Sequence, residues 1–138
     1  MTKKIALSVI LQLCLLISFA QVKIQHLLTE NQTNPGGLDA VQPRLSWQLL
    51  SDKRNVTQTA YEIVVSEGKN AVWKSGKVIS DHSVQVPYAG TLLQSNKKYT
   101  WQVRVWDNNE KKSDWSESAT FQMALLVVTD WKAKLIEP

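Results

Sequence analysis

The clearest alternation of apolar and polar side chains in the chain begins at Tyr99. The first set of alternate positions is apolar or aromatic: Tyr99, Trp101, Val103 and Val105. The positions between them are mostly polar: Thr100, Gln102, Arg104 and Trp106. Because successive side chains of a strand point to opposite faces, this pattern predicts a β-strand with one face in a core. Turn-forming and charged residues fill 107–112, and Trp115, Ala119, Phe121 and Met123 resume the alternation, which predicts a hairpin.

The rest of the chain contains shorter stretches of the same kind, separated by residues that favour turns. The expected strands are residues 22–27, 43–49, 59–65, 72–78, 84–86, 99–106 and 115–123. The fourth is interrupted by Gly76, which indicates a bulge or an edge strand. No helical period of comparable length occurs. Seven short strands in a stretch of this length predict an all-β fold, an immunoglobulin-like or fibronectin type III β-sandwich of about seven antiparallel strands.

The first twenty residues have the composition of a signal peptide, so we exclude residues 1–20 from the fold. Two lysines precede an apolar run at residues 5–17, and small residues stand at positions 18 and 20, just before Gln21. A membrane anchor is the alternative, but this run is shorter than the roughly 20 residues that span a bilayer. Cys14 is the only cysteine of the chain. We therefore expect export without disulfides, to the periplasm or the exterior of a bacterium.

The expected sandwich occupies residues 21–123, and the character of the chain changes after it. Residues 124–128 are all apolar and precede Asp130-Trp131-Lys132. An apolar run at the end of a domain needs a surface that covers it. We therefore expect the exit segment, residues 124–138, either to pack back on the sandwich or to begin a further domain.

Charge gives no sign of a polyanionic partner. Removing residues 1–20 removes two lysines and no acidic residue, which lowers the formal net charge from +4 to +2. The longest basic clusters are the lysine pairs at 97–98 and 111–112, and both flank expected turns. We therefore expect neither nucleic acid nor, after signal cleavage, a membrane as a partner.

Candidate chemistry is equally sparse. Four carboxylates lie close together in the sequence: Asp107, Glu110, Asp114 and Glu117. They belong to a solvated turn, whereas an acid catalyst needs a site that desolvates its carboxyl group. Both histidines, His26 and His82, lack a second ligand at metal-binding spacing. We expect no catalytic, cofactor or metal site in this chain.

Two resemblances to known families rest on particular motifs. The spacing from Leu93 to Tyr99 resembles the fibronectin type III tyrosine corner, which implies a structural Tyr99 whose hydroxyl bonds to nearby backbone. A more specific set of motifs occurs at residues 34–39 (NPGGLD), 43–47 (PRLSW), 58–65 (QTAYEIVV), 73–78 (WKSGKV), 86–90 (VPYAG), 99–107 (YTWQVRVWD) and 114–116 (DWS). Their order and spacing resemble the N-terminal fibronectin-type module of bacterial α-L-rhamnosidases.

This second resemblance implies a fragment of a larger glycoside hydrolase. In that family the module precedes further β-sandwich domains and a helical barrel, where two acidic residues carry out inverting hydrolysis. No position of this chain matches the acidic motif, so the resemblance implies no catalytic residue here. It implies a non-catalytic accessory module, truncated before the catalytic domain, whose partners are the neighbouring domains of the parent enzyme.

The tryptophans leave a second function open. Trp47 and Trp101 take inward positions and are predicted to be structural core residues. The other candidates, Trp73, Trp106 and Trp115, could contact a rhamnose-containing glycan or a partner domain through exposed rings. A competing structural role is a stack of Arg104 on Trp115, worth about 0.5–1 kcal/mol, as in the tryptophan–serine repeat of cytokine-receptor sandwiches, which residues 114–116 resemble. We favour the structural role and keep a free-standing carbohydrate-binding module as the alternative function.

Overall fold

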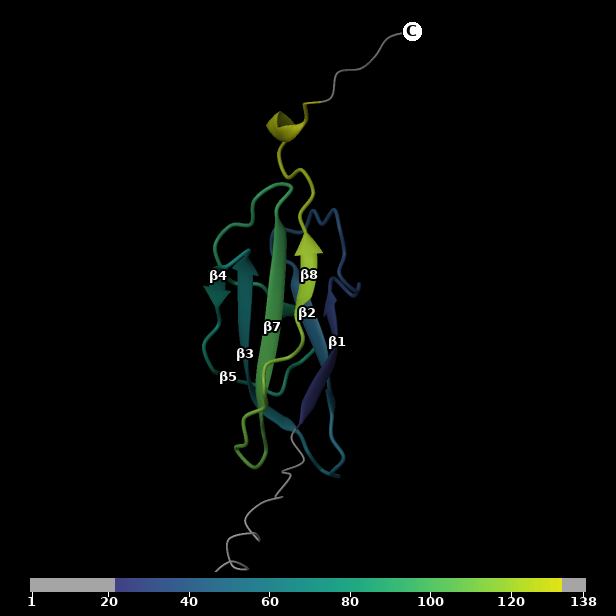
Figure 1. Ribbon diagram of the computed structural model, residues 1–138, viewed down its shortest axis with the longest axis vertical. Helices are drawn as coiled ribbons and strands as arrows, with labels where there is room; N and C mark the ends of the chain where they lie inside the picture. Colours follow the sequence, from purple (N-terminus) through teal and green to yellow (C-terminus); the bar gives the residue numbers. More distant parts are fainter. Residues whose placement is uncertain (1–21, 133–138) are drawn as a thin grey trace, which may run out of the picture.

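The computed structural model describes residues 22–132 as an elongated sandwich of two β-sheets (Figure 1). The predicted signal peptide and the last six residues of the exit segment lie outside the described residues. A three-stranded sheet has the order β1-β2-β6, and the second sheet has the order β4-β3-β7-β8 with β5 also paired to β3. Every pairing of these strands is antiparallel. The predicted all-β sandwich is therefore confirmed.

The described strands are β1 (Lys23–Thr29), β2 (Arg44–Leu50), β3 (Gln58–Glu67), β4 (Asn70–Lys74), β5 (Val78–Ile79), β6 (Val86–Pro87), β7 (Lys98–Asp107) and β8 (Ala119–Gln122), followed by the short 3-10 helix η2 (Val128–Asp130). The long alternating stretch that dominates the sequence is β7. Its partners are β3 along one edge and β8 along the other.

Two strand predictions between β3 and β7 are wrong in detail. The expected strand at 72–78 is divided into β4 and β5, because Gly76 has a φ of +63° and the chain turns there. The expected strand at 84–86 is β6, which begins only at Val86. Gln85 has a φ of +53°, outside the extended region, and Val84 before it is exposed.

The core lies between the two sheets and is built from the inward positions that the alternation predicts. Its largest fully buried side chains include Trp47, Trp101 and Tyr99. The N–H group of each buried indole has an acceptor: Trp47 Nε1 donates to Gln58 Oε1 at 2.9 Å, and Trp101 Nε1 donates to Thr29 Oγ1 at 3.1 Å. Within residues 22–132, no buried side-chain nitrogen or oxygen lacks a hydrogen-bond partner. The module therefore has a closed, fully bonded core of its own.

The exit segment is tied to the end of the sandwich where the tyrosine corner lies. Tyr99 is buried, and its hydroxyl accepts a hydrogen bond from the Gln94 backbone N–H at 2.9 Å. The next loop positions hold the exit segment: Asn96 N–H donates to the Ala124 carbonyl at 3.1 Å, and Leu126 N–H donates to Ser95 Oγ at 2.9 Å. Beyond these bonds the chain extends away from the sandwich (Figure 1).

Candidate functional site

The outward face of the five-stranded sheet carries an ion pair between two of its central strands. Glu62 on β3 and Arg104 on β7 are cross-strand partners, so their side chains project on the same side. Arg104 Nη2 lies 2.6 Å from Glu62 Oε2, and Arg104 Nε donates to the same oxygen at 2.7 Å. Both side chains are partly buried. The guanidinium group is therefore held in one orientation.

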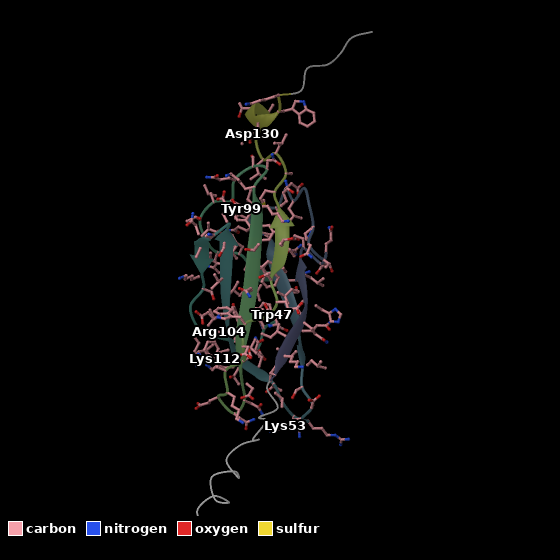
Figure 2. All side chains as sticks on the ribbon, in the orientation of Figure 1. Trp47, Lys53, Tyr99, Arg104, Lys112 and Asp130 are labelled. Carbon is pink, nitrogen blue, oxygen red and sulfur yellow. The ribbon has the colours of Figure 1, made fainter. Side chains whose placement is uncertain are left out.

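This guanidinium group is part of a row of cations and rings, the cation–aromatic ladder, made of Lys77, Trp106, Arg104 and Trp115. Arg104 Cζ lies 4.4 Å from the ring centroid of Trp115 and 5.7 Å from that of Trp106. Lys77 Nζ lies 4.6 Å from the ring centroid of Trp106. Figure 2 labels Arg104 on β7. Trp106 already contacts two cations, which leaves it less ring surface for a ligand than Trp115 has.

The segment that carries Trp115 does not form the strand that the alternation predicts. Ser113 and Ser116 follow β7 instead: Ser113 Oγ accepts from Val105 N–H at 3.0 Å, and Ser116 Oγ accepts from Val103 N–H at 3.1 Å. Their own N–H groups donate to the carbonyls of the same two valines, each at 2.8 Å. This segment therefore bonds to β7 at every third residue, whereas an antiparallel strand would bond at every second residue. Trp115 therefore points outward, 37% exposed, and regular pairing resumes only at β8.

Trp73 lies elsewhere and is used in packing. It projects from β4 and meets Tyr88 edge to face, with ring centroids 5.0 Å apart. Burial raises the pKa of the Tyr88 hydroxyl, which donates to the Thr91 carbonyl at 2.8 Å. A Cβ atom at Gly90 would lie 2.5 Å from Trp73 Cβ, so the loop fits only without a side chain. The structure thus brings Trp106, Trp115 and Arg104 together and places Trp73 apart from them.

A groove of about 880 Å³ opens between β1 and residues 114–119. Residues 34–38 cover the outer edge of β8, through bonds such as Thr120 N–H to Asn34 Oδ1 at 2.8 Å and Gln122 N–H to the Pro35 carbonyl at 3.0 Å. The groove begins where residues 34–38 no longer cover this edge of the sheet. Trp115 lines the groove, together with Asp114 and Glu117. The groove is missed by sequence reasoning because its two sides are about ninety residues apart in the chain.

The remaining candidate groups have structural or solvated positions. Asp107 is the one acidic residue that is buried in the described part of the chain, and its Oδ1 accepts the N–H groups of Asn109 and Lys111 at 2.8 and 2.9 Å. It therefore stabilises the turn after β7. Across residues 22–132, no three side chains are grouped as a metal site would need. The same residues include no helix long and apolar enough to cross a membrane.

The two-sheet sandwich, the hydroxyl bond of Tyr99 and the ladder on the outer face define an immunoglobulin-like domain. The family described as "Rha78A-like, N-terminal immunoglobulin domain" matches residues 24–127. The chain therefore belongs to this family, and the predicted resemblance to the N-terminal module of α-L-rhamnosidases is confirmed.

Known relatives are much longer than this chain. It is 43% identical to an α-L-rhamnosidase of Streptomyces avermitilis over 107 residues, which make up 74% of this chain and 10% of that protein. An α-L-rhamnosidase of Formosa agariphila is 37% identical over 119 residues, 81% of this chain and 13% of the relative. The crystal structure of the Streptomyces avermitilis enzyme complexed with L-rhamnose matches with a TM-score of 0.79 and 39% identity, over 82% of this chain and 12% of that one.

Proposed function

We propose that this chain is the non-catalytic N-terminal accessory module of an exported α-L-rhamnosidase that acts on rhamnose-containing glycans. Membership of the family and the names of the relatives support an α-L-rhamnosidase as the parent enzyme. The positions of the acidic side chains support a non-catalytic role. Inverting hydrolysis needs two acidic groups facing each other across a bound sugar, one of them with a raised pKa. Asp107, the buried candidate, instead accepts two backbone N–H groups of its own turn.

The observation that carries a packing role is the exit-end patch: Leu125, Val127, Val128 and Trp131. All four are exposed, with Val128 at 91% and Trp131 at 67%. The patch begins beside Leu126, whose N–H makes the last hydrogen bond to the sandwich among the described residues, and lies where the chain leaves it (Figure 1). Burying one such side chain is worth roughly 1.5–3 kcal/mol. Consecutive exposed apolar residues of this size indicate a surface that another domain covers.

We assign the following domain of the same polypeptide as the partner of the exit-end patch. The matched region of the family ends at residue 127, within the patch, and the matched relatives are about eight to ten times as long as the match. A domain that continues from residue 132 would begin beside these side chains. Docking there would orient the module relative to the rest of the enzyme without any residue of the module entering the active site.

The size of the native product tests the assignment to a larger enzyme. An antibody raised against residues 21–123 is used to probe the source cells and their medium. We expect a band several times larger than 15.6 kDa, enriched in the exported fraction. A single band at the size of this chain would contradict the proposal. Rhamnosidase activity in the purified 138-residue chain would contradict its non-catalytic role.

A variant of the complete product tests the docking surface. Val128→Asp places a charge in the exit-end patch, and Ile79→Asp is the matched control, since Ile79 is 78% exposed on β5 outside the patch. We expect Val128→Asp to separate the unfolding of the module from that of the following domain in calorimetry. Ile79→Asp should leave the unfolding transitions coupled. Equal behaviour of the two variants would rule out docking through Val128.

A further inference from the structure

The groove between β1 and residues 114–119 is poorly suited to a polypeptide strand. Strand addition needs a regular row of free backbone N–H and C=O groups along an edge. On one side of the groove, β1 is interrupted by a bulge between Gln25 and Leu28, where His26 has a φ of +50°. On the other side, Ser113 and Ser116 contact β7 at every third residue, so the segment between them is not an extended ladder. Neither side offers a regular edge.

The size and side chains of the groove suit a small polar ligand. Its volume of about 880 Å³ lies within the range of roughly 300–1,000 Å³ that is usual for small-molecule sites. Trp115 supplies an aromatic surface in its wall, and apolar surface comes from Ile24 and Leu27 of β1 and from Val22 just before that strand. The aromatic surface is oriented in advance, because Arg104 lies 4.4 Å from the Trp115 ring and is itself bonded to Glu62 at 2.6 Å. Such preorganisation lowers the entropy cost of binding.

The charges in the groove favour a ligand that donates hydrogen bonds and carries no negative charge. Asp52, Asp114 and Glu117 line it, against one lysine, Lys23. All three carboxylates are exposed, and their side chains form no hydrogen bond or ion pair with the described residues. Ionised carboxylates only accept hydrogen bonds, so they suit the hydroxyl groups of a neutral sugar and repel phosphates and uronates. The electron-rich face of an indole suits the C–H groups of the same ligand.

We propose that this groove binds a neutral carbohydrate, with the C–H side of a sugar ring against Trp115 and sugar hydroxyls donating to Asp114 and Glu117. The assignment of a rhamnosyl group as that sugar rests on the proposed function. The groove lies toward the end of the sandwich that is opposite the exit segment: Lys53, next to Asp52, and Asp130 are at opposite ends in Figure 2. A glycan could therefore bind while the exit-end patch is covered.

The test is an NMR titration of the chain from Gln21 onward, which contains the whole closed core, with methyl α-L-rhamnoside and, in parallel, methyl α-D-glucoside. We expect the rhamnoside to shift the indole N–H resonance of Trp115 and the amide of Glu117. Trp115→Ala should weaken binding by about tenfold or more. The matched control is Trp131→Ala, which removes a more exposed tryptophan outside the groove and should leave the affinity unchanged.

A second variant keeps the test valid if Trp115→Ala unfolds the chain. Asp114→Asn with Glu117→Gln changes two exposed side chains, so the fold should persist while affinity falls, since half of the acceptor oxygens become donors. No shift at Trp115 with saturating rhamnoside would overturn the proposal, as would binding that survives both variants. An equal response to the glucoside would overturn the rhamnosyl assignment. The size of the native product is measured independently, so the failure of one proposal is distinguishable from the failure of the other.

Discussion

Replacing Ser116 by alanine tests whether the segment before β8 is held by side-chain hydroxyl groups. Ser116 Oγ accepts the backbone N–H of Val103, and Val103 is completely buried in the middle of β7. Alanine removes the acceptor and leaves that N–H group in a site from which water is excluded. An unsatisfied buried donor costs about 1–3 kcal/mol of unfolding free energy. The serine hydroxyl also donates to the Glu117 carbonyl at 2.8 Å, and this carbonyl can be solvated instead.

The assay is chemical denaturation monitored by tryptophan fluorescence, combined with amide hydrogen exchange at Val103. We expect Ser116→Ala to lower the unfolding free energy by about 2 kcal/mol and Tm by roughly 8–16 °C for a domain of this size. Ser116→Thr retains the hydroxyl group and should recover part of the loss. Ser118→Ala is the matched control, because Ser118 is exposed two residues away. If Ser116→Ala and Ser118→Ala agree within about 0.3 kcal/mol, the hydroxyl bond does not stabilise this segment.

Two further changes test packing and charge. Gly90→Ala should cost about 1–3 kcal/mol of unfolding free energy, because the new Cβ would lie 2.5 Å from Trp73 Cβ, whereas Gly36→Ala, with no atom within 4 Å of the new Cβ, should be nearly neutral in the same denaturation assay. Glu30→Gln should remove part of the pH dependence of stability. Hydrogen bonds from Arg44 hold the pKa of Glu30 below its usual value, so its contribution is present at neutral pH and is lost as pH falls through the folded-state pKa. The difference between wild type and Glu30→Gln should therefore shrink on acidification, and a difference that grows below pH 4 would contradict this reasoning.

The alternation in the sequence predicted the parts of the fold in which one side of a strand meets the core. Tyr99, Trp101, Val103 and Val105 are all buried, because a sandwich covers one face of each sheet and leaves a period of two in the hydrophobic pattern. The same reasoning predicted that Trp47 belongs to the core. Nothing in such a pattern specifies which strands pair or in what register. The cross-strand pair of Arg104 with Glu62 was therefore not predictable, although the alternation placed Arg104 on an outward face.

The strand predicted to begin at Trp115 begins only at Ala119, because serine hydroxyl groups replace backbone carbonyls as the acceptors for β7 before that point. A period of two was extended from Ala119 and Phe121 back through Trp115, but residues 113–118 follow β7 by serine hydroxyl groups spaced three apart. The signal in the sequence is the pair Ser113 and Ser116, which brackets the tryptophan. Serine is favoured where a side chain replaces a backbone partner, so this spacing was readable as a local exception to the ladder.

The position of Trp115 follows from constraints on both of its sides. Ser116 fixes the backbone after it to β7, and Arg104, held by Glu62, fixes the ring. Orienting a large side chain costs conformational entropy, and here that cost is met within the folded module before any ligand binds. A purely structural ring could be covered completely, as those of Trp47 and Trp101 are. Trp115 instead keeps part of its surface open to the groove, so the same two constraints that stabilise the segment also hold an exposed aromatic surface in one orientation, as the proposed carbohydrate site requires.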